Sequence, residues 1–73
     1  MSERPNELKK LAGIAADTGM ADELRAKSME LIGKIGTHEA LLVLLDLAAN
    51  RELVKEEREF ALKYSLDIIK AGH

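Results

Sequence analysis

The sequence predicts an all-α fold in which four helices form about two stacked helical hairpins, a short α-solenoid or bundle. Apolar residues recur three and four positions apart between glycine-containing breaks, which is the spacing of one helix face. No segment alternates apolar and polar residues as a half-buried strand does. Leu and Ala dominate the composition, and both favour helices. A chain of 73 residues has room for a single domain, expected to span residues 1–73.

The first expected helix begins near Pro5, because the missing N–H of proline costs nothing in a first helical turn. Its apolar face repeats at helical spacing and comprises Leu8, Leu11, Ala12 and Ala15. The helix is expected to stop at residues 17–19, where Gly19 can take the left-handed conformation that ends many helices. Thr18 or Asp22 is expected to cap the second helix.

The later helix boundaries follow from similar signals. The second expected helix ends at Gly36, again through a left-handed glycine. Thr37 is a good N-cap and predicts a third helix over residues 38–49, antiparallel to the second. A softer break at residues 50–52 precedes the fourth expected helix, over residues 53–71. Acidic residues crowd the first turns of that helix, where the helix dipole favours anions.

The third expected helix is unusual because residues 40–49 are apolar on every side apart from Asp46. Such a helix is normally buried on more than one side, so we expect it at the centre, in contact with the other three. Its face toward the core is expected to comprise Leu41, Leu44, Leu45 and Ala48. Leu42, Val43 and Asp46 point the other way, so either the fourth helix or another chain must cover them.

An internal repeat underlies the helix pattern. A shift of 33 positions aligns identical residues, among them Leu8 with Leu41, Leu11 with Leu44, Ala15 with Ala48, Ala16 with Ala49, and Arg25 with Arg58. Near matches include Asp17 with Asn50 and Met29 with Leu62. A period in the thirties with two helices per unit is typical of stacked helical hairpins, each of which buries its apolar face only against its neighbour.

Residues 24–45 carry a more specific pattern, with small Ser28 in mid-helix and an Ile-Gly-Lys-Ile-Gly hinge at residues 32–36. Thr37 and then Glu-Ala-Leu at residues 39–41 follow, ahead of a Leu-rich helix. This segment resembles a HEAT-like repeat of the phycobilisome-lyase type, although His38 stands where the family usually has Pro. The resemblance implies paired helices in a stack. Gly33, costly inside a helix, predicts that a neighbouring helix approaches closely there.

Composition excludes several function classes. Eleven Lys and Arg against thirteen Asp and Glu give a net charge of −2, unlike a basic nucleic-acid binder. The chain has no Cys, and His38 and His73 have no third ligand at a metal-binding spacing, so we expect no metal, no cofactor and no enzyme activity. Residues 40–45 form the longest apolar run, too short for a bilayer. With no signal peptide, a cytoplasmic location is expected.

The sequence favours a non-catalytic protein–protein interaction or assembly module that self-associates. Exposed apolar residues on an otherwise charged protein indicate a contact site, and a symmetric homodimer is the simplest cover for them. The residues expected to bind a protein partner or a second copy are Lys10, Leu42, Val43, Asp46 and Asn50. We expect Val43→Glu to change self-association more than stability.

The alternative function is a nucleic-acid-binding helical regulator. The second expected helix could then serve for recognition, with Arg25, Lys27 and Lys34 pointing outward. Glu23 and Glu30 flank these bases and weaken this alternative. The charged run at residues 55–59 is interpreted as a solvated face of the fourth helix.

Overall fold

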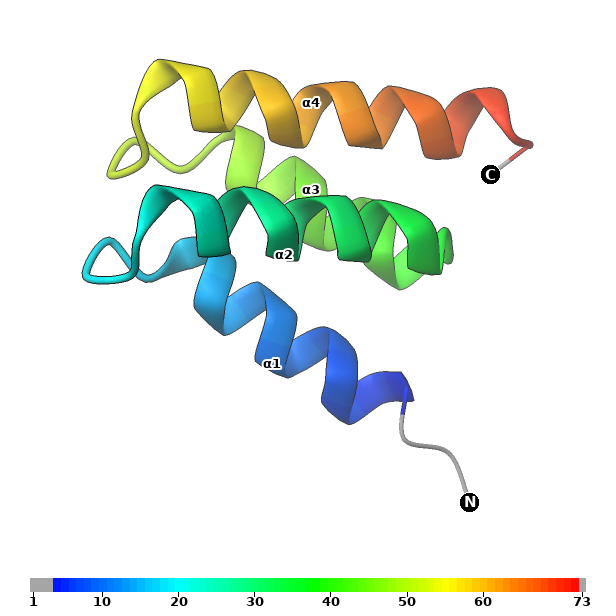
Figure 1. Cartoon of the computed structure of the whole chain (residues 1–73). Coiled ribbons are helices and arrows are strands. Elements are labelled where there is room, and N and C mark those ends of the chain that lie inside the picture. The colour runs from blue at the N-terminus through cyan, green and yellow to red at the C-terminus, as the bar shows by residue number, and fades with distance from the viewer. Residues whose placement is uncertain (1–3, 73) are drawn as a thin grey trace.

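The computed structural model describes residues 4–72, which fold into four helices. They are α1 (Arg4–Ala16), α2 (Asp22–Ile35), α3 (His38–Ala48) and α4 (Lys55–Lys70). Successive helices run in opposite directions, and α1 crosses α2 obliquely (Figure 1). Within residues 4–72 there is no strand, so the predicted all-α fold with four helices is confirmed.

The helices pack as two hairpins. The most extensive contacts join α1 to α2 and α3 to α4, and we refer to residues 4–35 and 38–70 as the first and second hairpins. The second hairpin lies against the first mainly through α2, which contacts both α3 and α4. The helix bounds follow the 33-residue shift closely, because α2 and α4 begin at matching positions after the N-caps Ala21 and Val54.

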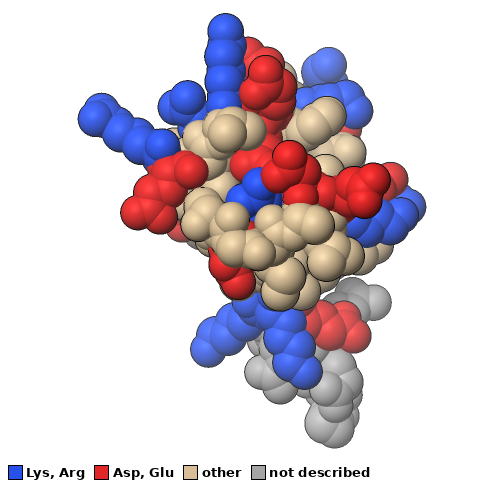
Figure 2. Space-filling view, turned by 60° about the vertical axis from the view of Figure 1, so that its left-hand side comes forward, with Lys and Arg blue, Asp and Glu red and all other residues tan. Residues whose placement is uncertain are grey.

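The turns within the two hairpins lie at the same end of the molecule (Figure 1) and are built alike. Asp17 Oδ1 accepts a hydrogen bond from Gly19 N at 2.8 Å, and Asn50 Oδ1 accepts one from Glu52 N at 2.9 Å. These turns are held by hydrogen bonds from the backbone to a side chain. The left-handed conformation expected at Gly19 was therefore wrong. In the described residues a positive φ occurs only at Gly36 and Gly72. Toward this end of the molecule, acidic and basic side chains crowd together around tan, uncharged atoms (Figure 2).

Two helix starts differ from the sequence expectation. The N-cap of α2 is Ala21 rather than Thr18 or Asp22, and Ala21 makes no side-chain capping bond. Asp22 instead pairs with Arg25 one turn later, which takes its carboxylate away from capping. The fourth helix begins at Lys55, two residues later than expected, because Leu53 is buried in the turn before it.

The junction between α2 and α3 is confirmed as predicted. Gly36 ends α2 with φ of 69°, a left-handed conformation that suits glycine. Thr37 Oγ1 accepts a hydrogen bond from Ala40 N at 3.1 Å and thus caps α3. This short turn makes α2 and α3 antiparallel (Figure 1).

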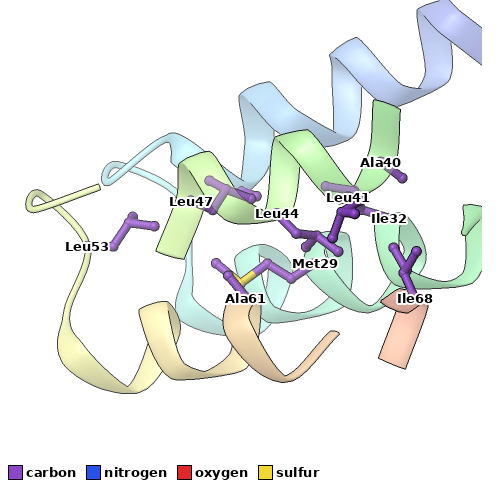
Figure 3. Close-up of a cluster of buried hydrophobic side chains, with 10 residues drawn as sticks. Met29, Ile32, Ala40, Leu41, Leu44, Leu47, Leu53, Ala61 and Ile68 are labelled. Carbon is purple, nitrogen blue, oxygen red and sulfur yellow. The ribbon is translucent and has the colours of Figure 1, made fainter. Parts of the chain in front are cut away.

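The core lies between α2, α3 and α4, where the side chains of Met29, Leu44 and Ala61 meet (Figure 3). As predicted, α3 contacts the other three helices. Leu41 and Leu44 are buried as expected, whereas the same prediction for Leu45 was wrong, since Leu45 is 39% exposed. Ala48 is half-buried. Leu47 is buried in place of Leu45, because α1 packs on that flank of α3.

The close approach predicted at Gly33 occurs against α4. A Cβ atom added at Gly33 would lie 3.1 Å from Tyr64 Cβ, closer than such atoms normally pack. Glycine therefore allows α2 and α4 to come together at this point, which compensates for its low helix propensity.

Candidate functional site

The five residues expected to bind a partner do not share one surface. Val43, Asp46 and Asn50 line a shallow hollow of about 190 Å³ between α3 and α1, opposite Ala12 and Ala16. Exposed Lys10 is two positions from Ala12 on α1, and residues two apart on a helix point to different sides. Leu42, which is 49% exposed, lies on the flank of α3 away from α1.

Inside the hollow, each side chain has a structural role or is open to solvent. Val43 is half-buried and packs against the core, so it does not point outward as expected. A charge at this position is therefore expected to cost stability, contrary to the sequence expectation for Val43→Glu. Asp46 is exposed and needs no ion-pair partner. The side chain of Asn50 accepts the hydrogen bond that forms the turn at residues 50–52.

A larger apolar surface covers the second hairpin on the side away from the first. Its five side chains are between 39% and 49% exposed, and we call them the C-side face: Leu42, Leu45, Leu62, Leu66 and Ile69. The first hairpin covers the flank of α3 that carries Leu47 and the flank of α4 that carries Tyr64. The other flank of each helix therefore points away from the first hairpin, and these two flanks lie on one side of the molecule. The fourth helix therefore does not cover Leu42, so the first of the two alternatives, a cover by the fourth helix, is excluded.

Sequence reasoning missed the α4 part of this face, although a signal for it exists. Leu62, Leu66 and Ile69 are spaced by four and three residues, which places them in one stripe. A second stripe on α4, containing Ala61 and Ile68, is buried against the core. Two adjacent apolar stripes on one helix indicate contacts on two sides, and the chain itself supplies one of them.

The first hairpin carries an apolar surface on the opposite side of the molecule. A hollow of about 440 Å³ between α1 and α2 is lined by Glu7, Leu11, Leu31, Lys34 and Ile35. Leu24 is 54% exposed on the same flank of α2, seven residues before Leu31. We call this surface the N-side face and define it by Leu11, Leu24, Leu31 and Ile35. The two hairpins thus have one uncovered apolar flank each.

Between the hairpins lies a buried ion pair. Arg25 Nη2 is 2.7 Å from Glu57 Oε2, and the side chains are 7% and 6% exposed. Arg25 also pairs with Asp22 and donates a hydrogen bond to the carbonyl of Asp17 at 3.4 Å. One guanidinium therefore ties the end of α1 and the start of α2 to α4. A buried charge needs such partners, because an unpaired one is costly.

Arg58 is the counterpart of Arg25 under the 33-residue shift, but its surroundings differ. It is half-buried and has no ion-pair partner among the described residues. Arg58 precedes Leu62 by four residues, so it lies beside the C-side face on α4. Arg25 is paired with Glu57 between the hairpins. Its counterpart Arg58 lies next to the C-side face and has no acidic partner in the described chain.

Two charge assignments from the sequence were wrong. Arg25 does not point outward as nucleic-acid binding would need, because Glu57 holds it inside. The run at residues 55–59 is not wholly a solvated face, since Glu57 is buried within it. Lys27 and Lys34 are exposed, and Glu30 lies 3.3 Å and 3.9 Å from their Nζ atoms. The acidic neighbour offsets both bases.

Within the described residues there is neither a group of side chains that could hold a metal ion nor a helix that could cross a membrane. There, no three His, Cys, Asp or Glu side chains lie close enough together to hold a metal ion. His38 is exposed at the start of α3, and His73 lies outside the described residues. No helix in residues 4–72 combines the length and apolar character that a bilayer crossing requires.

Comparison with family models, with curated proteins and with solved structures finds no match for this chain. The HEAT-like resemblance of residues 24–45 therefore stays a prediction.

Proposed function

We propose that this chain is a non-catalytic protein-binding module that self-associates, and that the C-side face makes the contact. The observation that carries the proposal is the exposure of five large apolar side chains on one side of the second hairpin. Contiguous apolar surface on a charged protein favours a protein contact. Leu42 is one of the predicted binding residues, and the exposure of the other four members of the face supports extending the proposed contact to them. The lack of Cys suits a reducing compartment, and we include the cytoplasm in the proposal.

The strength of this contact can be bounded. Burying a Leu or Ile completely contributes about 1.5–3 kcal/mol, so covering the remaining half of each contributes about 1 kcal/mol. The whole face then gives about 5 kcal/mol, before the cost of lost translational and rotational freedom. Contacts from the rest of the interface must offset that cost. We therefore expect weak association, with a dissociation constant in the micromolar to millimolar range.

The nucleic-acid alternative has less support from the described residues. It depended on Arg25, Lys27 and Lys34 as outward bases, and Arg25 is buried. With a net charge of −2, the chain also lacks the electrostatic attraction that dominates nucleic-acid affinity. Protein binding therefore remains the better proposal.

Light scattering over a wide concentration range tests the proposal. We expect the apparent mass of the wild-type chain to rise with concentration, and Leu62→Glu to shift that rise to at least about tenfold higher concentration. Phe60→Glu is the matched control, because Phe60 is 44% exposed on the same helix but points to another side. A wild-type chain that stays monomeric up to millimolar concentration contradicts the proposal, as does equal weakening by both variants.

A further inference from the structure

We infer that copies of this chain associate head to tail, with the C-side face of one copy packed on the N-side face of the next. This inference rests on the proposed self-association and specifies its geometry. The contact would continue the interface between the two hairpins from one chain into another. Two observations support it: the positions that make up the C-side face and those that make up the N-side face.

The C-side face occupies the positions through which the first hairpin packs on the second. Under the 33-residue shift, Leu62 corresponds to Met29 and Leu66 to Gly33. Met29 is 0% exposed, and Gly33 lies against Tyr64 of α4. The side of the first hairpin that contacts the second is thus repeated on the second hairpin, where within the described chain nothing covers it.

The N-side face occupies the complementary positions. Under the same shift, its members Leu11, Leu31 and Ile35 correspond to Leu44, Tyr64 and Ile68. These three line the side of the second hairpin on which α2 packs, and Leu44 and Ile68 are buried there. The hollow of about 440 Å³ between α1 and α2 lies at the equivalent place on the first hairpin. It can therefore receive α4 of another copy as the second hairpin receives α2.

The side chains at the new contact set a wider spacing between the helices than those of the internal interface. Within the chain, a small residue meets a large one where Gly33 lies against Tyr64. Between copies, the same two positions are Leu66 and Leu31, so two side chains of medium size replace the small and the large one. Because each leucine carries a Cβ, the two helices are expected to lie further apart between copies than α2 and α4 do at Gly33.

The charges do not repeat, and this difference makes the inference testable. Arg25 pairs with Glu57 between the hairpins. Between copies, the matching residues are Arg58 and Leu24, so the arginine would meet an apolar side chain. The contact between copies lacks the buried ion pair of the internal interface and is expected to be weaker. Supplying the missing acid at position 24 should strengthen it.

The first experiment compares Leu24→Glu with Leu24→Gln in the full chain by light scattering. Under head-to-tail packing, Leu24→Glu should associate about tenfold more tightly than Leu24→Gln, because its carboxylate meets Arg58 of the neighbouring copy. Adding Arg58→Gln should abolish the difference. Leu24 is 54% exposed, so neither substitution is expected to disturb folding. Equal or weaker association of Leu24→Glu would overturn the inference.

The second experiment separates head-to-tail from face-to-face packing. Leu31→Glu damages the N-side face and Leu62→Glu the C-side face, so each variant alone should stay monomeric. Their mixture should form a one-to-one dimer, because each variant retains the face that the other lacks. Thermal unfolding checks that both variants fold, and the more exposed Leu24→Arg replaces Leu31→Glu if it does not.

The outcomes of the mixing experiment distinguish the inference from the proposed function. If Leu31→Glu alone dimerises while Leu62→Glu does not, two C-side faces meet each other, which overturns the head-to-tail geometry and leaves the proposed function intact. If the wild-type chain itself never associates, both fail together. A dimer that forms only in the mixture supports both.

Discussion

The two hairpins have matching helix bounds, yet they bury matching positions differently. Met29 in the first hairpin is fully buried, whereas its counterpart Leu62 in the second is 47% exposed. Arg25 is enclosed in an ion pair with Glu57, whereas Arg58 has no ion-pair partner in the described chain. The difference arises because each hairpin is covered on one flank only. Helical spacing thus shows which residues can be buried, but the neighbouring hairpin determines which of them are.

The largest difference in stability is expected between substitutions of Arg25 and of its counterpart Arg58. Arg25→Met leaves Glu57 buried without its partner, which should lower the free energy of unfolding by about 3–5 kcal/mol. Arg58→Met removes no ion pair found in the described residues and should change it by less than about 1 kcal/mol. Urea unfolding measures both. The double variant Arg25→Met with Glu57→Leu should recover most of the loss, because it removes both charges. Equal losses for the two single variants would contradict the comparison.

The next effect concerns the matched apolar pair. Met29→Ala should cost about 2–5 kcal/mol, because it opens a cavity among Leu44, Ala61 and their neighbours in the core. Leu62→Ala should cost less than about 1 kcal/mol in the monomer, since the side chain is half-exposed already. Thermal unfolding at low concentration checks both values. A loss above 2 kcal/mol for Leu62→Ala would place this residue inside the monomer and remove the C-side face.

The sequence was informative where the signal is local. The end of α2 at Gly36 and the cap of α3 at Thr37 depend on a few adjacent residues, and both were predicted correctly. Apolar spacing likewise placed Leu41 and Leu44 in the core.

The errors concern contacts between residues far apart in the chain. Arg25 and Glu57 are both charged and each looks solvent-exposed on its own helix, so their burial follows only from the packing of α2 on α4. Likewise, the side from which α1 approaches α3 decides that Val43 is half-buried and Leu45 exposed. The α3 sequence is apolar on both flanks and does not determine that direction. The partner-binding role of Lys10, Asp46 and Asn50 remains a prediction.

The smallest expected effect compares two glycines inside helices. At Gly13 of α1 an added Cβ would meet no atom within 4 Å, whereas at Gly33 it would meet Tyr64 Cβ at 3.1 Å. Replacing a helical glycine by alanine stabilises a helix by about 1 kcal/mol when nothing opposes it. Gly13→Ala should therefore raise the melting temperature by about 4–8 °C, as a gain of about 1 kcal/mol does in a domain of this size.

Gly33→Ala should raise the melting temperature less than Gly13→Ala or lower it, because the contact with Tyr64 Cβ lies beside the α4 backbone and α2 must move outward to make room. Thermal unfolding of the two variants side by side gives the comparison, and both share the same gain in helix propensity. The difference between them therefore isolates the packing between the hairpins. Equal gains would mean that α2 and α4 can separate at Gly33 without cost. The packing between the hairpins would then not be specific, and neither would the contact between copies that we infer from it.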